Sequence, residues 1–178
     1  RSYTSGFSSS RADVLFQRPD LRRDVKTLRA LASAEISSGN PESAVELLER
    51  ALHAQIAEVG ERNVTAVDVL AELAGAYLAL DDDVSAMRTA NHALDVLDQS
   101  DGISTLSRVG PNTALSEIFI AAGDYERAEE LLNEAAEICR KHVRRGDIQT
   151  YHALSALSLL RLAQGRNSDA ENVAREAL

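Results

Sequence analysis

The sequence predicts an all-α protein built from a repeated pair of antiparallel helices. Its main support is a set of alanines spaced 42 residues apart, namely Ala44, Ala86, Ala128 and Ala170. A second alanine follows each of these by seven residues, and a leucine precedes each by 13 residues. The 178 residues include only three Pro and nine Gly, so long uninterrupted helices are allowed. Self-similarity at a fixed period of this length indicates a helical repeat structure.

The first helix of each unit is predicted from one apolar stripe that ends at a turn. From Leu70 to Tyr77, apolar residues are spaced as i, i+3, i+4 and i+7, which places them on one helical face. This stripe stops at Asp81, and the other three units have glycine at the equivalent position: Gly39, Gly123 and Gly165. Because glycine readily adopts the left-handed conformation that ends a helix, we expect the first helices to end there.

The second helix of each unit is predicted to begin directly after this turn. Asn40, Asp82 and Asp124 follow the turn residues and are expected to cap the helices that they precede. Pro41 would occupy the first helical position, where its missing N–H costs nothing. Small alanines such as Ala44 would then let the two antiparallel helices approach closely.

These helix pairs resemble the tetratricopeptide repeat. Leu70-x-x-Leu73-Ala74-x-x-Tyr77, followed by Ala86 and Ala93, fits the pattern of that family closely. The 42-residue period, rather than the usual 34, resembles the longer-helix variety of kinesin light chains and bacterial signalling ATPases. The resemblance covers residues 25–178 and implies a right-handed superhelical solenoid of about four units.

The outer units depart from the family pattern more than the two central ones do. Glu35 and Arg161 stand where the family has an aromatic residue, and Asn112 replaces the bulky first residue. Ala90 and Ala174 are small residues at bulky positions. We therefore expect the outer units to be adapted to ends of the stack or to contacts outside this chain.

In this family the first helices line a concave face that binds peptides. Carried over onto this sequence, the expected partner-binding residues are Arg29, Ala71, Gly75, Leu78, Thr113, Glu117, Ile120, His152 and Ser155. The centre of such a groove would be small and apolar, with few charges, and would suit an amphipathic helix or an extended apolar segment. The ring of Lys and Asn with which chaperone-binding members hold a C-terminal carboxylate is not matched here.

The first 24 residues form a basic, Ser-rich extension to the acidic repeat domain of residues 25–178. Residues 1–29 contain seven Lys and Arg against three acids, whereas residues 30–178 contain 12 against 25. Within the extension, Leu15 and Phe16 belong to a short apolar patch. We expect this patch to dock on an acidic or apolar surface, either of this chain or of a partner.

The extreme N-terminal sequence also predicts a location. Residues 1–12 contain five Ser, two Arg and no acid, a composition that resembles a mitochondrial or plastid transit peptide. The start at Arg1 resembles a matrix-processing site, and the alternative is a boundary inside a longer protein. The expectation is a mitochondrial protein, with a cytoplasmic or plastid location as the alternative.

No residue pattern indicates catalysis, a cofactor or a metal site. Cys139 and His142 could share a helical face, but zinc sites need three or four ligands. No phosphate-binding glycine loop, paired-His metalloprotease motif or nucleophile elbow occurs. The basic cluster from Arg140 to Arg145 is explained by the dipole at a helix C-terminus, with contact to RNA or anionic lipid as the alternative.

The sequence therefore predicts a non-enzymatic scaffold that binds other proteins, as a subunit of a hetero-oligomeric and organellar complex. Two alternatives are a peptide- or ligand-sensing module of a signalling protein and an RNA-processing adaptor. The net charge of −9 argues against the whole chain being a nucleic-acid binder. No apolar run is long enough to span a bilayer.

Overall fold

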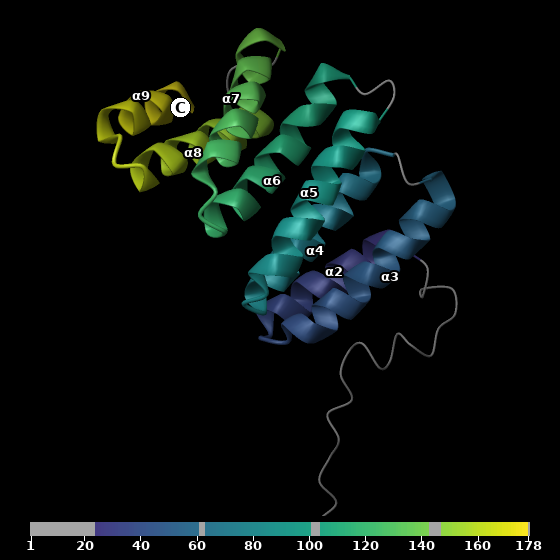
Figure 1. Ribbon diagram of the computed structural model, residues 1–178. Helices are drawn as coiled ribbons and strands as arrows, with labels where there is room; N and C mark the ends of the chain where they lie inside the picture. Colours follow the sequence, from purple (N-terminus) through teal and green to yellow (C-terminus); the bar gives the residue numbers. More distant parts are fainter. Residues whose placement is uncertain (1–23, 61–62, 101–103, 143–146, 178) are drawn as a thin grey trace, which may run out of the picture.

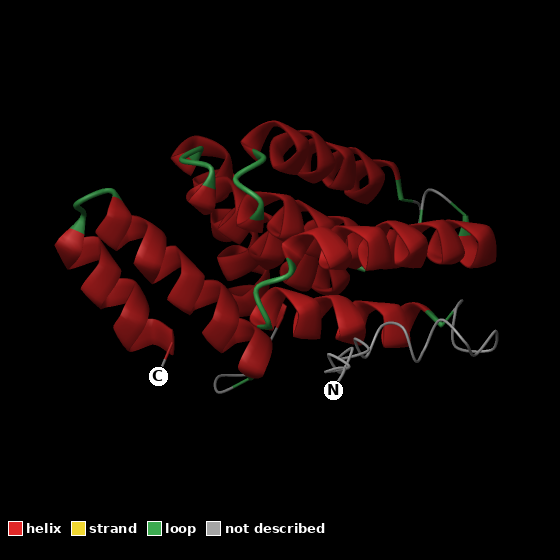
Figure 2. Ribbon diagram, turned by 90° about the horizontal axis from the view of Figure 1, so that it is seen from below, coloured by secondary structure: helices red, strands yellow, loops and turns green. Residues whose placement is uncertain are grey.

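The computed structural model describes residues 24–60, 63–100, 104–142 and 147–177, and these residues are almost entirely helical (Figures 1 and 2). The helices are α2 (Val25–Ser37), α3 (Pro41–Val59), α4 (Thr65–Ala79), α5 (Asp83–Gln99), η1 (Thr105–Arg108), α6 (Val109–Ala121), α7 (Tyr125–His142), α8 (Ile148–Ala163) and α9 (Asn167–Ala177). No strand occurs in these four ranges, so the predicted all-α class is confirmed.

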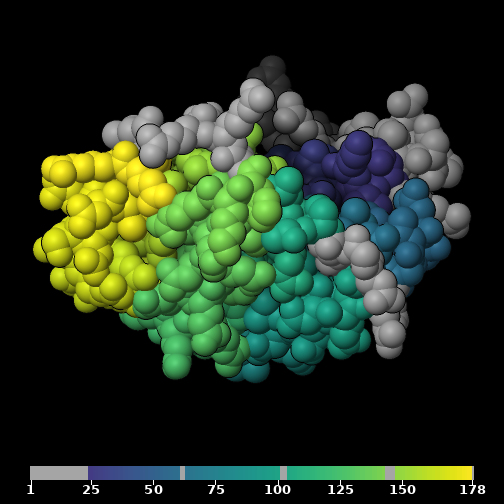
Figure 3. All heavy atoms as spheres, turned by 90° about the horizontal axis from the view of Figure 1, so that it is seen from above, coloured from purple at the N-terminus to yellow at the C-terminus, as the bar shows by residue number. Residues whose placement is uncertain are grey.

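The helices pair in chain order and the pairs stack side by side. Each first helix packs on the second helix of its own pair, giving α2/α3, α4/α5, α6/α7 and α8/α9. Successive pairs then contact each other through α4 and α6 and through α6 and α8. The order of colours in Figure 3 shows the pairs following one another along the molecule. This stack of four helix pairs is the predicted solenoid.

The turn inside each pair repeats with the 42-residue period. Gly39, Asp81, Gly123 and Gly165 have φ angles of 80°, 58°, 80° and 74°. In the first pair the N–H of the following residue, Asn40, donates to the Glu35 carbonyl five residues earlier, over 2.9 Å. The equivalent bonds of the other three pairs measure 3.0, 2.8 and 2.8 Å. This is the Schellman arrangement, in which a left-handed residue lets the end of one helix satisfy its own last carbonyls.

Two of the three predicted N-caps are confirmed. The Asp82 carboxylate accepts a hydrogen bond from the Ser85 N–H over 3.0 Å, and Asp124 accepts one from the Arg127 N–H over 3.3 Å. Asn40 also stands at the N-cap position of α3, but its side chain makes no capping bond, and its amide donates instead to the Glu35 carboxylate over 3.0 Å.

The residues spaced by 42 form the core. The alanines Ala44, Ala86, Ala128 and Ala170 are at most 2% exposed. The leucines Leu73, Leu115 and Leu157 are buried, whereas Leu31 in the first pair is half-buried. The difference follows from position, because α4, α6 and α8 each pack against a helix of the preceding pair, whereas α2 belongs to the first pair of the described residues.

Polar networks replace two of the aromatic and bulky residues of the family pattern, at Arg161 in the last pair and at Asn112 in the third. Arg161 is only 7% exposed, and its guanidinium contacts the Glu129 carboxylate of α7 and donates to the Gln164 side chain over 3.1 Å. Asn112 is fully buried, and its amide donates to the Glu134 carboxylate over 3.0 Å. These side chains therefore join neighbouring helices by charge and hydrogen bonds where the family pattern would use apolar contact.

Candidate functional site

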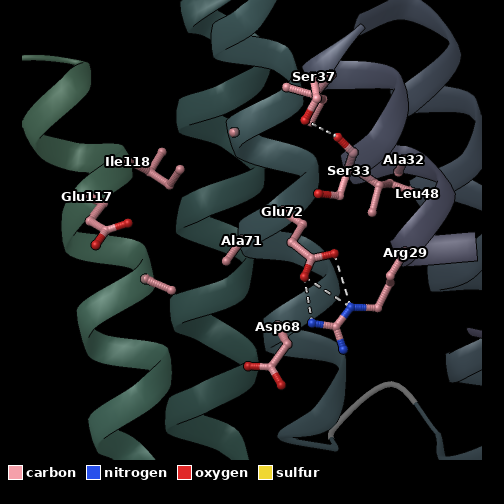
Figure 4. A pocket seen from close by; sticks show the side chains of 13 residues that line it. Arg29, Ala32, Ser33, Ser37, Leu48, Asp68, Ala71, Glu72, Glu117 and Ile118 are labelled. Atoms are coloured by element: carbon pink, nitrogen blue, oxygen red, sulfur yellow. Dashed lines mark hydrogen bonds and ion pairs between the residues drawn. The ribbon is translucent and has the colours of Figure 1, made fainter. Parts of the chain in front are cut away.

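A pocket of about 520 Å³ opens between α2, α4 and α6, the first helices of three successive pairs (Figure 4). The residues that line it are Arg29, Ala32, Ser33, Ile36, Ser37, Leu48, Asp68, Ala71, Glu72, Gly75, Ala114, Glu117 and Ile118. It lies on the face where the resemblance placed a groove, and we call it the α2–α4–α6 groove.

Small residues produce this hollow. Ala32 and Ala71 are nearly buried at 1% and 6% exposure, so their methyl groups form part of the apolar floor. Gly75 is helical and has no side chain to fill the space towards α6. A Cβ added at Gly75 would meet the Ile118 Cδ1 at 3.6 Å, an ordinary van der Waals contact. The groove therefore exists because α4 presents only the methyl group of Ala71 and the hydrogen of Gly75, where larger side chains would fill the space.

A bidentate ion pair links two walls of the groove. The Arg29 guanidinium of α2 donates to the Glu72 carboxylate of α4 through Nε, at 3.1 and 3.0 Å, and through Nη2 at 2.6 Å. Figure 4 shows this pair bridging the two helices. Since direct packing between α2 and α4 is slight, the pair joins the first unit to the second at this face.

Two further carboxylates leave the groove with an excess of negative charge. Asp68 lies one turn before Glu72 on α4, and Glu117 is exposed on α6. Burial raises the pKa of the Asp68 carboxyl and the nearby Glu72 charge raises it further, while Arg29 acts in the opposite direction. The only cation among the lining residues is Arg29, which is already engaged by Glu72.

The structure brings four of the predicted partner-binding residues together: Arg29, Ala71, Gly75 and Glu117 line the groove. Five others do not line it. Leu78 is half-buried, and Ile120 packs against the core. Thr113 is buried, and its hydroxyl donates to the Val109 carbonyl over 2.8 Å.

The remaining two lie on α8, beyond the hollow. His152 is exposed and its ring lies edge-on to that of Tyr151, with centroids 6.0 Å apart, while Ser155 is half-buried. The hollow thus covers three units rather than the four that the sequence suggested. Whether any of these nine residues binds a partner stays a prediction.

Several lining residues were missed by the sequence reasoning, above all Asp68 and Glu72. The expectation of a groove with few charges is wrong for this reason. A pattern could have found Asp68, because it lies three residues before Ala71 and seven before Gly75 on the same helical stripe. Glu72 lies on the same stripe, four residues after Asp68 and three before Gly75, and its carboxylate accepts hydrogen bonds from Arg29 of the neighbouring unit.

The other candidates considered from the sequence show no site chemistry. Cys139 is 1% exposed, and burial raises the pKa of its thiol. Across the four described ranges, no group of three or more His, Cys, Asp and Glu could hold a metal ion. No helix in these ranges is both long and apolar enough to cross a membrane.

The basic cluster is partly neutralised by its own neighbours. Arg140 donates to the Glu176 carboxylate of α9 at 2.6 and 2.8 Å, and Lys141 pairs with Glu137 at 2.5 Å. Arg144 and Arg145 lie outside the described residues, as do Leu15 and Phe16 of the N-terminal extension.

Comparison with known proteins identifies the repeat. Residues 111–142, which span most of α6 and all of α7, match the family model described as tetratricopeptide repeat. No curated protein matches the sequence.

Three solved structures have similar folds. A Podosopora anserina putative kinesin light chain with nearly identical TPR-like repeats shares 22% identity at a TM-score of 0.65, covering 86% of this chain and 72% of that one. BtubC (BKLC) from P. vanneervenii shares 22% identity at a TM-score of 0.67, covering 93% and 68%. MamA is more distant, with 17% identity and a TM-score of 0.54, covering 93% and 81%.

The match and the geometry agree. The matched pair α6/α7 has a turn at Gly123 that is repeated with the same left-handed conformation in the other three pairs. The long second helices, of 19, 17 and 18 residues in the first three pairs, accompany the 42-residue period. Residues 111–142 therefore match a tetratricopeptide repeat, and the fold of the chain is similar to that of kinesin light chain-like repeat structures.

Proposed function

We propose that the chain is a non-enzymatic protein-interaction scaffold and that its α2–α4–α6 groove holds a segment of a partner protein. The observation that carries this proposal is the position of the groove. It lies across the first helices of three successive repeats, where small residues leave an open hollow with an apolar floor.

The dimensions of the groove favour a peptide segment. Its lining residues on α2 run from Arg29 to Ser37, which lie eight positions apart and therefore about 12 Å apart along a helix. An extended chain covers that distance with about four residues. The apolar floor at Ala71 and the charged walls at Glu72 and Glu117 would suit a segment with apolar side chains facing inwards and polar groups at the rim.

A substitution at Gly75 offers a sharp test. In tagged full-length chain, Gly75→Met would fill the hollow with a flexible side chain, whereas Gly75→Ala adds one methyl group that the structure accommodates. Partners would be captured from the native source with wild type and both variants and compared by quantitative mass spectrometry. We expect one set of proteins to be recovered with wild type and Gly75→Ala and depleted at least about tenfold with Gly75→Met, which corresponds to a loss of about 1.4 kcal/mol.

Equal recovery with all three chains would contradict the proposal. As a control, the circular dichroism spectrum of Gly75→Met must show the same helical content as that of wild type. If that variant misfolds, Glu117→Lys replaces it, because Glu117 is an exposed lining residue whose charge can be reversed without altering the core.

The same experiment addresses the wider role that we propose, as a subunit of a hetero-oligomeric complex in mitochondria. The support for this location is the composition of residues 1–12, with five Ser, two Arg and no acid. Co-elution of the captured set with this chain in one peak on size-exclusion chromatography would support the complex. Cell fractionation that leaves the chain outside mitochondria would contradict the location.

A further inference from the structure

The segment of residues 11–23 and the α2–α4–α6 groove carry opposite charge. The segment contains four arginines (Arg11, Arg18, Arg22 and Arg23) and two aspartates (Asp13 and Asp20). The groove is lined by three carboxylates and one guanidinium. The segment also contains the apolar run Val14-Leu15-Phe16, which matches the apolar floor.

Asp68 is the part of the groove that most needs a cation. Arg29 is engaged by Glu72 through three hydrogen bonds, and the described residues give Asp68 no hydrogen-bond donor. The carboxylate is half-buried beside a second negative charge, an arrangement that disfavours its ionised form. An arginine placed beside Asp68 would remove this disadvantage.

The segment can reach the whole groove. Helix α2, which forms one wall, begins at Val25, nine residues after Phe16. Nine extended residues span up to about 30 Å, more than twice the roughly 12 Å length of the groove along α2. Because the linker is short, the segment is present at the groove at an effective concentration in the millimolar range. Even a weak interaction would then keep the segment bound.

We propose that residues 11–23 dock in the α2–α4–α6 groove of their own chain, with Val14-Leu15-Phe16 against Ala71 and Gly75 and an arginine beside Asp68. This inference rests on the proposed function, because the segment would then cover the surface offered to a partner protein. A partner protein must displace the segment before it can bind. The apparent affinity of the partner is therefore its affinity for the open groove multiplied by the fraction of chains in which the groove is open.

Fluorescence can test this in the chain of residues 1–178, which contains no Trp. Phe16→Trp places a single reporter in the apolar run, and Phe7→Trp is the matched control in the Ser-rich stretch upstream. We expect Phe16→Trp to emit at shorter wavelength than Phe7→Trp and to be less accessible to acrylamide. High salt should reduce both differences, because the attraction between segment and groove is screened.

Second substitutions locate the docking site. Adding Gly75→Met or Asp68→Asn to Phe16→Trp should return emission and quenching to the values of Phe7→Trp. Asp95→Asn removes the same charge from an exposed position on α5 and should leave the Phe16→Trp emission blue-shifted. Both groove variants retain a readout of folding in their helical circular dichroism.

Three results would overturn the inference. Identical spectra of Phe16→Trp and Phe7→Trp would show that the segment does not dock. A blue shift that survives both groove substitutions would place the segment elsewhere. A blue shift that grows with protein concentration would show docking onto a second copy. Partner capture with Gly75→Met is a separate readout, so the proposed function can stand when this inference fails, and the reverse also holds.

Discussion

A single Gly→Ala substitution in the groove should stabilise the protein. Gly75 lies inside α4, which runs from Thr65 to Ala79, and its φ is not positive. The Cβ of an alanine would meet only the Ile118 Cδ1, at 3.6 Å, so no atom has to move. Alanine is favoured over glycine in a helix interior by about 1 kcal/mol, and we expect Gly75→Ala to raise the free energy of unfolding by that amount.

The same substitution at Gly123 should have the opposite effect. Gly123 has a φ of +80°, and an added Cβ would meet no atom within 4 Å. Its cost therefore comes from the backbone alone, and forcing alanine into this conformation should lose about 1 kcal/mol or more. Both substitutions restrict the unfolded chain in the same way. The expected difference of about 2 kcal/mol between them thus belongs to the native state.

Thermal and urea unfolding followed by circular dichroism would measure both variants. For a chain of this size, 1 kcal/mol corresponds to about 2–4 °C in Tm, so the two variants should differ by about 4–8 °C. A Gly75→Ala variant less stable than wild type would show that α4 and α6 leave no room for a methyl group, and the groove would lose its structural basis. A neutral Gly123→Ala would refute the left-handed turn.

The remaining predictions concern the core, one turn and one ion pair. Leu115 is fully buried and Leu31 half-buried at the same repeat position, so urea unfolding should show a loss of about 2.7–5 kcal/mol for Leu115→Ala and a clearly smaller loss for Leu31→Ala. Asp81→Gly should raise the free energy of unfolding by up to about 1 kcal/mol, because Asp81 has a φ of 58° where the other units use glycine. Hydrogen bonds from Gln164 and then Arg161 lower the pKa of Glu129 below its ordinary value of 4.5. The stability that Glu129 contributes is therefore present above pH 4.5 and is lost as the pH falls through its folded-state pKa. Urea unfolding of Glu129→Gln at several pH values should show a smaller loss of stability on acidification than wild type.

The features that could be predicted from the sequence are those determined by near neighbours along the chain. The turn at Gly123 and the cap at Asp82 depend on residues three to five positions away, and the sequence shows those spacings directly. The burial of Leu115 was predicted from its place in the repeat, although its contacts come from several helix pairs. Asn40 stands at the predicted N-cap position, but its side chain bonds to Glu35, five residues earlier, and makes no capping bond to α3.

The features that could not be predicted depend on the neighbouring repeat. Arg29 and Glu72 are 43 residues apart and Arg140 and Glu176 are 36 apart, so these pairs form only when one unit packs on the next. A sequence separation close to 42 residues between two opposite charges indicates a possible ion pair, because residues nearly one repeat apart can meet across adjacent helices. Which two charged residues pair still depends on the rotation of each helix about its own axis. The apolar stripe defines this rotation only approximately. For this reason the ion pair between Arg29 and Glu72 emerged from the structure, whereas Arg29 and Glu117 were already expected in the groove.

Residues that recur with the repeat build the fold, whereas the residues that line the groove differ from one repeat to the next. Positions that recur with the 42-residue period, such as Ala86 and Leu115, are buried and build the same helix pair each time. Positions that face the groove do not recur: the repeat equivalents of Gly75 are Ser33, Glu117 and Leu159. Leu159 is 64% exposed on α8, so the side chain at this position is large where the hollow is no longer found. The shape and charge of the groove are therefore free to vary without loss of the fold, and ligand preference should follow substitutions at Gly75 and its equivalents rather than at the alanines of the core.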